Sequence, residues 1–113
     1  MTIDMKNRNK KIYEMRANIL KAMAHPSRLL MIDALNEHGE MCVCDLVDLV
    51  GADQSTVSKH LALLKQAGLV DDRKEGTKSF YRLARPCVLN FFECVEQVME
   101  ENLKAQQEAL SAR

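Results

Sequence analysis

Two cysteines separated by a single residue, Cys42 and Cys44, are the side chains of this 113-residue chain with the greatest capacity for chemistry. Thiolates are soft donors, which favour As(III), Sb(III), Cd(II) or Pb(II) over harder ions. On a regular α-helix, residues two apart point about 200° away from each other, whereas in an extended segment they share a face. The pair therefore holds one ion only where the backbone around it is extended. The simpler alternative is two small buried side chains, because cysteine is often buried.

Five helices and a hairpin are predicted around these thiols. Pro26 suits the first turn of the second helix, Asp53 suits the N-cap of the fourth, and two β-patterned runs flank Gly76. The predicted elements are helices over about 10–23, 26–38, 44–50, 54–67 and 86–110, and strands over about 69–73 and 78–83. The fold class is therefore mainly α with a small β-hairpin. We expect a single domain over residues 1–113, ordered from about residue 10 to 110.

The helices over 44–50 and 54–67, joined by a turn that contains Gly51, have the arrangement that places a second helix in the DNA major groove. Small polar side chains at the start of that helix allow close approach to the backbone, and Gln54 can read a base edge. The hairpin over 69–83 would act as a wing that adds phosphate contacts. The candidate DNA-binding residues are Gln54, Ser55, Thr56, Ser58, Lys59, His60, Arg73, Lys74 and Lys78. The alternative is an ordinary helical hairpin with a solvated polar face.

The net charge of zero conceals an uneven distribution along the chain. Residues 33–53 carry six carboxylates and no Lys or Arg, whereas residues 54–82 carry six Lys or Arg against three carboxylates. The positive charge thus coincides with the predicted DNA-facing elements, which favours a nucleic-acid partner. An ordinary scatter of surface charge is the alternative, because charge alone decides little.

The last predicted helix has an apolar face that is wider than packing on one small core requires. This face includes Phe91, Phe92, Val95 and Met99 and spans about 160° of the helix circumference. Burial against both the core and a second copy of the chain would explain its width, and the helix over 10–23 has an apolar stripe of its own. We therefore predict a homodimer that recognises a pseudo-palindromic double-stranded DNA site.

The sequence contains no apolar run long enough to span a membrane, and residues 1–16 lack the apolar core of a signal peptide. We therefore expect a cytoplasmic protein that has no membrane partner. In that compartment, cysteines are usually free thiols or metal ligands rather than disulfides.

Four motifs together resemble the ArsR/SmtB family of metal-sensing repressors. They are His25-Pro26-Ser27-Arg28-Leu29, Cys42-Val43-Cys44-Asp45-Leu46, Ser55-Thr56-Val57-Ser58-Lys59-His60-Leu61 and Gln66-Ala67-Gly68-Leu69-Val70. The resemblance runs from about residue 17 to 100 and implies a homodimeric winged helix-turn-helix repressor that leaves its operator when an inducer binds. The Cys-Val-Cys-Asp-Leu stretch is similar to that of arsenite sensors and of cadmium/lead sensors. It implies As(III) or Sb(III) as the inducer, with Cd(II) or Pb(II) as the alternative, and no permanently bound cofactor.

The chain departs from the arsenite-sensor pattern at Val47, where many such repressors have a third cysteine. In winged helices, the residues before the reading pair usually add a short strand beside the strand that here ends near Leu83, which would bring Cys87 close to Cys42. Cys94 lies two turns further, about 10 Å along the helix. We therefore rank Cys87 first and Cys94 second as the third ligand. The alternative for both is a core thiol on an apolar helix face.

Three other functions compete with this one. A thiol-redox repressor of the same fold would use a disulfide or polysulfide between Cys44 and a thiol on an α-helix. A thiol oxidoreductase using Cys42 and Cys44 is disfavoured, because neither a thioredoxin-like alternation of strands and helices nor an active-site proline accompanies the pair. A helical adaptor without a DNA-binding role is disfavoured by the basic hairpin. We therefore predict a transcription regulator and not an enzyme.

Overall fold

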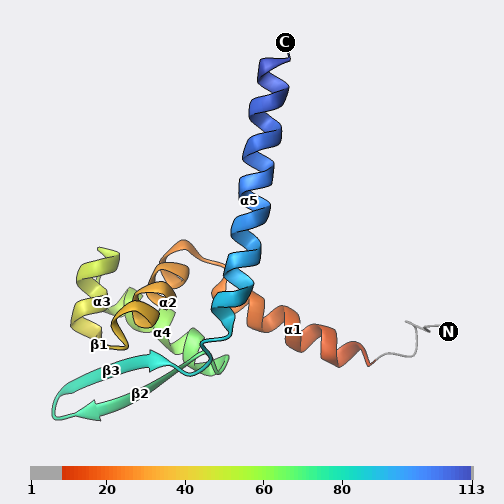
Figure 1. The fold of residues 1–113 in the computed structure, drawn as a ribbon. Coiled ribbons are helices and arrows are strands. Elements are labelled where there is room, and N and C mark those ends of the chain that lie inside the picture. Colours follow the sequence, from red (N-terminus) through yellow and green to blue (C-terminus); the bar gives the residue numbers. More distant parts are fainter. Residues whose placement is uncertain (1–8, 113) are drawn as a thin grey trace.

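A computed structural model describes residues 9–112; residues 1–8 and 113, the ends of the predicted domain, lie outside the described part. The fold is mostly helical with one small antiparallel sheet (Figure 1). In chain order the elements are α1 (Lys10–Met23), α2 (Pro26–His38), β1 (Glu40–Cys42), α3 (Val43–Val50), α4 (Gln54–Gln66), β2 (Val70–Glu75), β3 (Lys78–Leu83) and α5 (Val88–Ser111). The three strands lie in the order β1-β3-β2, so β1 joins the outer edge of the predicted hairpin. The arrangement is that of a winged helix-turn-helix.

The helix ends follow the local signals in the sequence. Asp53 caps α4, and its carboxylate accepts a hydrogen bond of 2.8 Å from the backbone N–H of Thr56. Gly51 ends α3 in the left-handed conformation, at φ 75°, which costs glycine little. The last helix begins later than predicted, because Pro86 and Cys87 form a turn before Val88.

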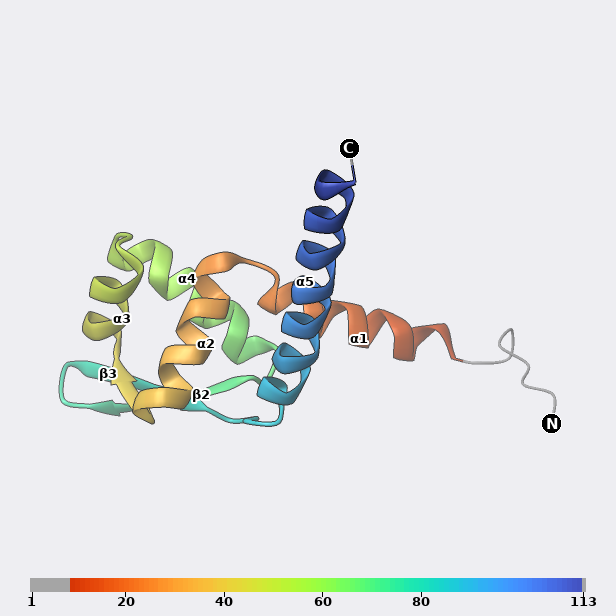
Figure 2. The same ribbon diagram turned by 45° about the horizontal axis from the view of Figure 1, so that its top comes forward.

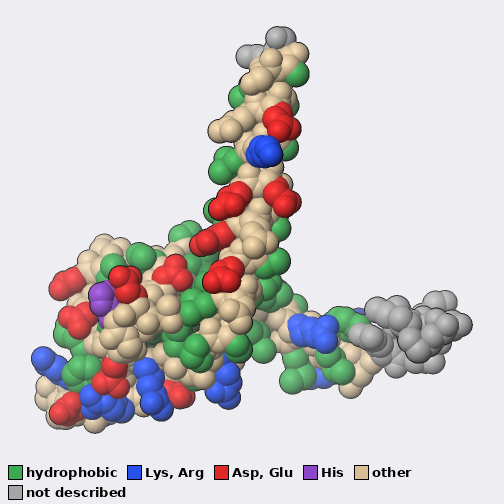
Figure 3. Space-filling view, viewed as in Figure 1, with side chains coloured by type: hydrophobic (Ala, Val, Ile, Leu, Met, Phe, Trp, Pro, Cys, Tyr) green, Lys and Arg blue, Asp and Glu red, His purple; other side chains and the backbone are tan. Residues whose placement is uncertain are grey.

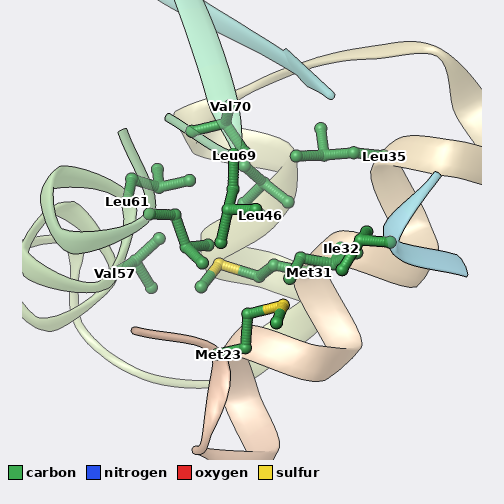
Figure 4. Close-up of a cluster of buried hydrophobic side chains, with 11 residues drawn as sticks. Met23, Met31, Ile32, Leu35, Leu46, Val57, Leu61, Leu69 and Val70 are labelled. Carbon is green, nitrogen blue, oxygen red and sulfur yellow. The ribbon is translucent and has the colours of Figure 1, made fainter. Parts of the chain in front are cut away.

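The core lies where α2, α3, α4 and the start of β2 meet (Figure 4). Its largest fully buried side chains are Met31, Ile32, Leu35, Leu46, Val57, Leu61, Leu64 and Val70. Three of these, Val57, Leu61 and Leu64, lie at successive turns of α4 and fix one face of this helix against the core. The opposite face of α4 is thereby directed to solvent.

Two helices extend away from this core. Helix α5 rises from the body and α1 projects to one side of it (Figures 1 and 2). Both carry large apolar side chains that a single chain leaves exposed: Ile12, Met15, Ile19 and Leu20 on α1, and Phe91, Val95, Val98, Met99 and Leu103 on α5. Single-chain packing thus covers only part of the wide apolar face of α5. No helix among the described residues is long and apolar enough to cross a bilayer.

Candidate nucleic-acid interface and thiol site

The start of α4 presents the predicted polar residues to solvent. Gln54, Ser55, Thr56, Ser58 and Lys59 are all exposed. The Ser55 hydroxyl donates a hydrogen bond of 3.1 Å to the Asp53 carboxylate. Hydrogen bonds from Thr56 and then from Ser55 hold the pKa of Asp53 below its usual value, so the cap stays ionised. The first turn of α4 is therefore rigidly capped and free on its outer side, as a helix that enters a groove must be.

His60 was predicted to contact phosphate, and the structure shows that this is wrong. Its side chain is only 8% exposed, and its Nδ1 accepts a hydrogen bond of 3.0 Å from Nε of Arg28. The same guanidinium donates to the carbonyl of Ala22 at 3.2 Å, and the His25 ring lies 4.5 Å from that of His60. The helical period explains the burial, because His60 follows Val57 by one turn on the inner face. His60 therefore ties α4 to the junction between α1 and α2.

This buried histidine predicts a pH dependence of stability. Burial, then the nearby His25 and Arg28, lower the pKa of His60 in the folded state. The unfolded chain binds the proton at higher pH, near the ordinary value of about 6.5, so stability is complete above that pH and falls as the pH drops through it. We expect urea unfolding to show a smaller loss between pH 7.5 and 5.5 for His60→Asn than for the parent. Equal losses in the two proteins would contradict the assignment.

Of the three wing cations predicted to contact DNA, two lysines are exposed and one arginine is bound by carboxylates. Lys74 and Lys78 lie on either side of the turn at Gly76 and are exposed, as predicted. Arg73 is instead bound by two carboxylates: its Nε and Nη2 donate to Glu40 at 2.6–3.0 Å, and its Nη1 donates to Glu75 at 2.9 Å. The phosphate contact of Arg73 stays a prediction, and in this conformation its donors are occupied by the two carboxylates.

Cys42 and Cys44 meet at the junction of strand and helix. Cys42 is both the last residue of β1 and the N-cap of α3, with an extended backbone, and Cys44 is the second residue of α3. A disulfide joins them, with the Cα atoms 5.2 Å apart, and the Cys42 sulfur also accepts a hydrogen bond from the backbone N–H of Asp45. The requirement for an extended segment is thus met at Cys42. The two sulfurs meet although α3 already begins at Val43.

The third member of this cluster is Asp45, which was not among the predicted ligands. One carboxylate oxygen of Asp45 and the sulfurs of Cys42 and Cys44 all lie within 4.8 Å of one another. Asp45 follows the N-cap Cys42 by three residues, and this spacing is the signal that could have identified it, since the N-cap side chain and the third helical residue face each other. The cluster therefore offers two sulfur donors and one oxygen donor.

The single chain does not bring Cys87 or Cys94 to this cluster. Cys42 lies opposite Phe80 in the sheet, and β3 continues for three more residues, about 10 Å, before the turn that leads to Cys87. Cys87 lies instead beside α1 and Gly68, and both cysteines are free and exposed. Within one chain, the expected role of Cys87 as third ligand is therefore not met.

Comparison with known proteins decides the family. The model described as "Bacterial regulatory protein, arsR family" matches residues 25–72, which include the thiol pair and all of α4. An HTH-type transcriptional regulator of Methanocaldococcus jannaschii is 42% identical over 86 residues, which cover 76% of this chain and 97% of that protein. The chain belongs to the arsR family of bacterial regulatory proteins.

Other similar proteins include two resistance regulators and one solved DNA-binding domain. The arsenical resistance operon repressor of Escherichia coli is 44% identical over 66 residues, 58% of this chain and 56% of that protein. The cadmium resistance transcriptional regulatory protein CadC of Listeria innocua is 33% identical over 87 residues, 77% of this chain and 73% of that protein. A homodimeric winged helix-turn-helix DNA-binding domain from Mycobacterium bovis has a TM-score of 0.72 at 33% identity, covering 89% of this chain and 95% of that one.

Proposed function

We propose that this protein is a homodimeric transcriptional repressor that leaves its operator when As(III) or Sb(III) binds the thiolates of Cys42 and Cys44. The observation that carries the proposal is the position of this pair. Its two sulfurs meet at the residue where β1 of the wing sheet becomes α3, directly before the helix with the exposed polar start. A ligand bound there acts on both DNA-facing elements.

Charge and exposure support the DNA-binding part of the proposal. Lys and Arg side chains gather at the wing end of the molecule, whereas Glu side chains line α5 (Figure 3). The exposed start of α4 would read base edges through Gln54, while Lys59, Lys74 and Lys78 would neutralise phosphates. Two such surfaces related by a two-fold axis would recognise a pseudo-palindromic operator.

Exposed apolar surface supports the dimer. The apolar residues of α1 and α5 lie on the two helices that project from the body, and the homologous domain from Mycobacterium bovis is a homodimer. Pairing of α1 and α5 with those of a second copy would remove this surface from water. We therefore assign α1 and α5 as the dimerisation helices.

Donor chemistry supports a soft inducer. In the reduced protein, Cys42 and Cys44 supply two thiolates, each of which loses its proton on binding. A trivalent metalloid takes a third donor from outside the pair, and Cys87 could provide it only from the second subunit. The Asp45 carboxylate within the cluster favours Cd(II) or Pb(II) as the second candidate, because these ions accept oxygen more readily.

The disulfide favours thiol-redox control as another candidate. It joins Cys42 to Cys44, so the earlier expectation of a bond between Cys44 and a distant helical thiol is replaced by a local one. Formation of this disulfide by a peroxide removes two electrons and two protons from the thiols and yields two waters or a water and an alcohol. The same junction between β1 and α3 would then respond to oxidation.

One assay separates these candidates. The reduced protein is bound to an operator duplex selected from a random library, and release is followed by fluorescence anisotropy with sodium arsenite, cadmium chloride or hydrogen peroxide. We expect arsenite to release the DNA at the lowest concentration. Release by peroxide alone would favour redox control, and release by cadmium alone would favour the cluster that includes Asp45. Equal affinity for the selected and a random duplex would overturn the repressor assignment.

A further inference from the structure

The guanidinium of Arg73 is held more tightly than any other wing cation. It makes a two-pronged contact with the Glu40 carboxylate, with hydrogen bonds of 2.6–3.0 Å, and a further one of 2.9 Å with Glu75. Its centre also lies 4.7 Å above the ring of Phe80. Among residues 9–112, Lys74 and Lys78 have no carboxylate within ion-pair distance, and Arg82 has only a longer contact of 3.9 Å with Asp71.

The register of the sheet connects this restraint with the thiol pair. Cys42, Phe80 and Arg73 lie in one row across β1, β3 and β2. Glu40 lies two residues before Cys42 on the same strand, and residues two apart on a strand share a face. Strand β1 therefore carries the partner of Arg73 at one end and the first thiol at the other.

We propose that Glu40 restrains the DNA affinity of the wing by occupying Arg73 in place of a DNA phosphate. Planar two-pronged acceptors, carboxylate and phosphate alike, match the guanidinium fork, so the two compete for the same donors. The ion pair is exposed, with half of the Arg73 side chain accessible, and exposed pairs are weak enough to exchange. While the pair holds, Arg73 makes no phosphate contact, and a movement of β1 at Cys42 that loosens the pair would free the guanidinium for DNA.

This inference rests on the proposed DNA-binding function but not on the identity of the inducer. It makes Glu40 a positioning residue that sets how many phosphates the wing neutralises. The number of phosphate contacts determines the slope of log affinity against log salt concentration, at about 0.9 per contact. That slope distinguishes a freed arginine from a general change in stability or folding.

The test uses the reduced full-length protein and a random-sequence duplex of about three helical turns, without inducer. We expect Glu40→Gln to bind roughly tenfold more tightly at low salt and to steepen the salt slope by about one unit per subunit. Glu37→Gln, which removes the same charge from an exposed position on α2, is the matched control and should keep the parent slope. Circular dichroism melting confirms that both variants are folded.

A double variant completes the experiment. In an Arg73→Ala background, Glu40→Gln should no longer change affinity or slope, because the group that it frees is absent. A parent-like slope or weaker binding for Glu40→Gln would overturn the inference, as would equal tightening with and without Arg73. A parent protein that binds no duplex would overturn the proposed function as well, whereas an unchanged slope on a well-bound duplex overturns only the role of Glu40.

Discussion

Replacing either Cys42 or Cys44 by serine should leave operator binding within about twofold of the parent and abolish release by arsenite. A serine hydroxyl is a poor ligand for a soft ion, so the inducer loses half of its thiolate pair. In the parent, the Cys42 sulfur accepts a hydrogen bond from the backbone N–H of Asp45. Serine is also a good N-cap, so the hydroxyl of Cys42→Ser can accept the same hydrogen bond. A 100-fold release in the parent corresponds to about 2.7 kcal/mol of coupling between the two sites, and both variants should lose all of it. The measurement is operator anisotropy titrated with arsenite under reducing conditions.

The two remote cysteines are the controls for this experiment. Cys87 and Cys94 are exposed and lie outside the cluster of the described chain, so Cys87→Ser and Cys94→Ser should respond as the parent does. Loss of the response in Cys87→Ser would identify the second subunit as the source of a third ligand. If both near-thiol variants remained fully inducible, the inducer would bind elsewhere and the proposed mechanism would fail.

A charge at Val95 should give monomers and remove operator binding. Val95 is 40% exposed in the single chain and lies with Phe91 and Met99 beside Leu20 of α1, in an apolar groove of about 420 Å³. Val95→Glu would place an unpaired carboxylate in the buried centre of the proposed interface, which is costly. Sedimentation velocity at micromolar concentration should show the monomer, and operator affinity should fall by roughly 100-fold or more because the second half-site is lost.

The matched variant is Glu100→Gln, which changes a charge on the polar side of the same helix. It should remain dimeric and bind the operator as the parent does. A parent protein that is monomeric under these conditions would refute the interface. A dimeric Val95→Glu protein would show that α5 does not lie at the centre of the dimer interface.

The sequence predicted well those parts of the fold that depend on local chemistry. The turn at Gly51, the cap at Asp53 and the proline at the start of α2 each act within one helical turn, and the structure has all three where they were expected. The buried face of α4 followed from the spacing of its apolar residues. These features need no knowledge of the rest of the chain.

The errors in the candidate site have a different origin. His60 was assigned by its polar type, although its spacing from Val57 and Leu64 places it on the inner face, where Arg28 satisfies it from 32 residues away. Arg73 stays a predicted phosphate contact, but the sequence did not reveal its partner Glu40, which is 33 residues distant. Contacts between such distant residues depend on strand register and tertiary packing, which hydrophobic periodicity does not specify. The same limit applies to Cys87, because its distance from Cys42 and Cys44 depends on the register of β3 and on the path of the chain after Leu83.

The unequal accessibility of Cys42 and Cys44 would give the proposed ligand binding an order. Cys42 is 5% exposed, whereas Cys44 is open to solvent. Under the proposed function, an incoming trivalent metalloid would form its first bond at the outer sulfur of the reduced pair and close the ring at the inner one. A reagent with a single reactive position, such as a monofunctional alkylating agent, stops at the outer sulfur and forms no bridge between strand and helix. We expect such a site to select its ligands by the number of bonds that they can make, before their affinity for sulfur is considered.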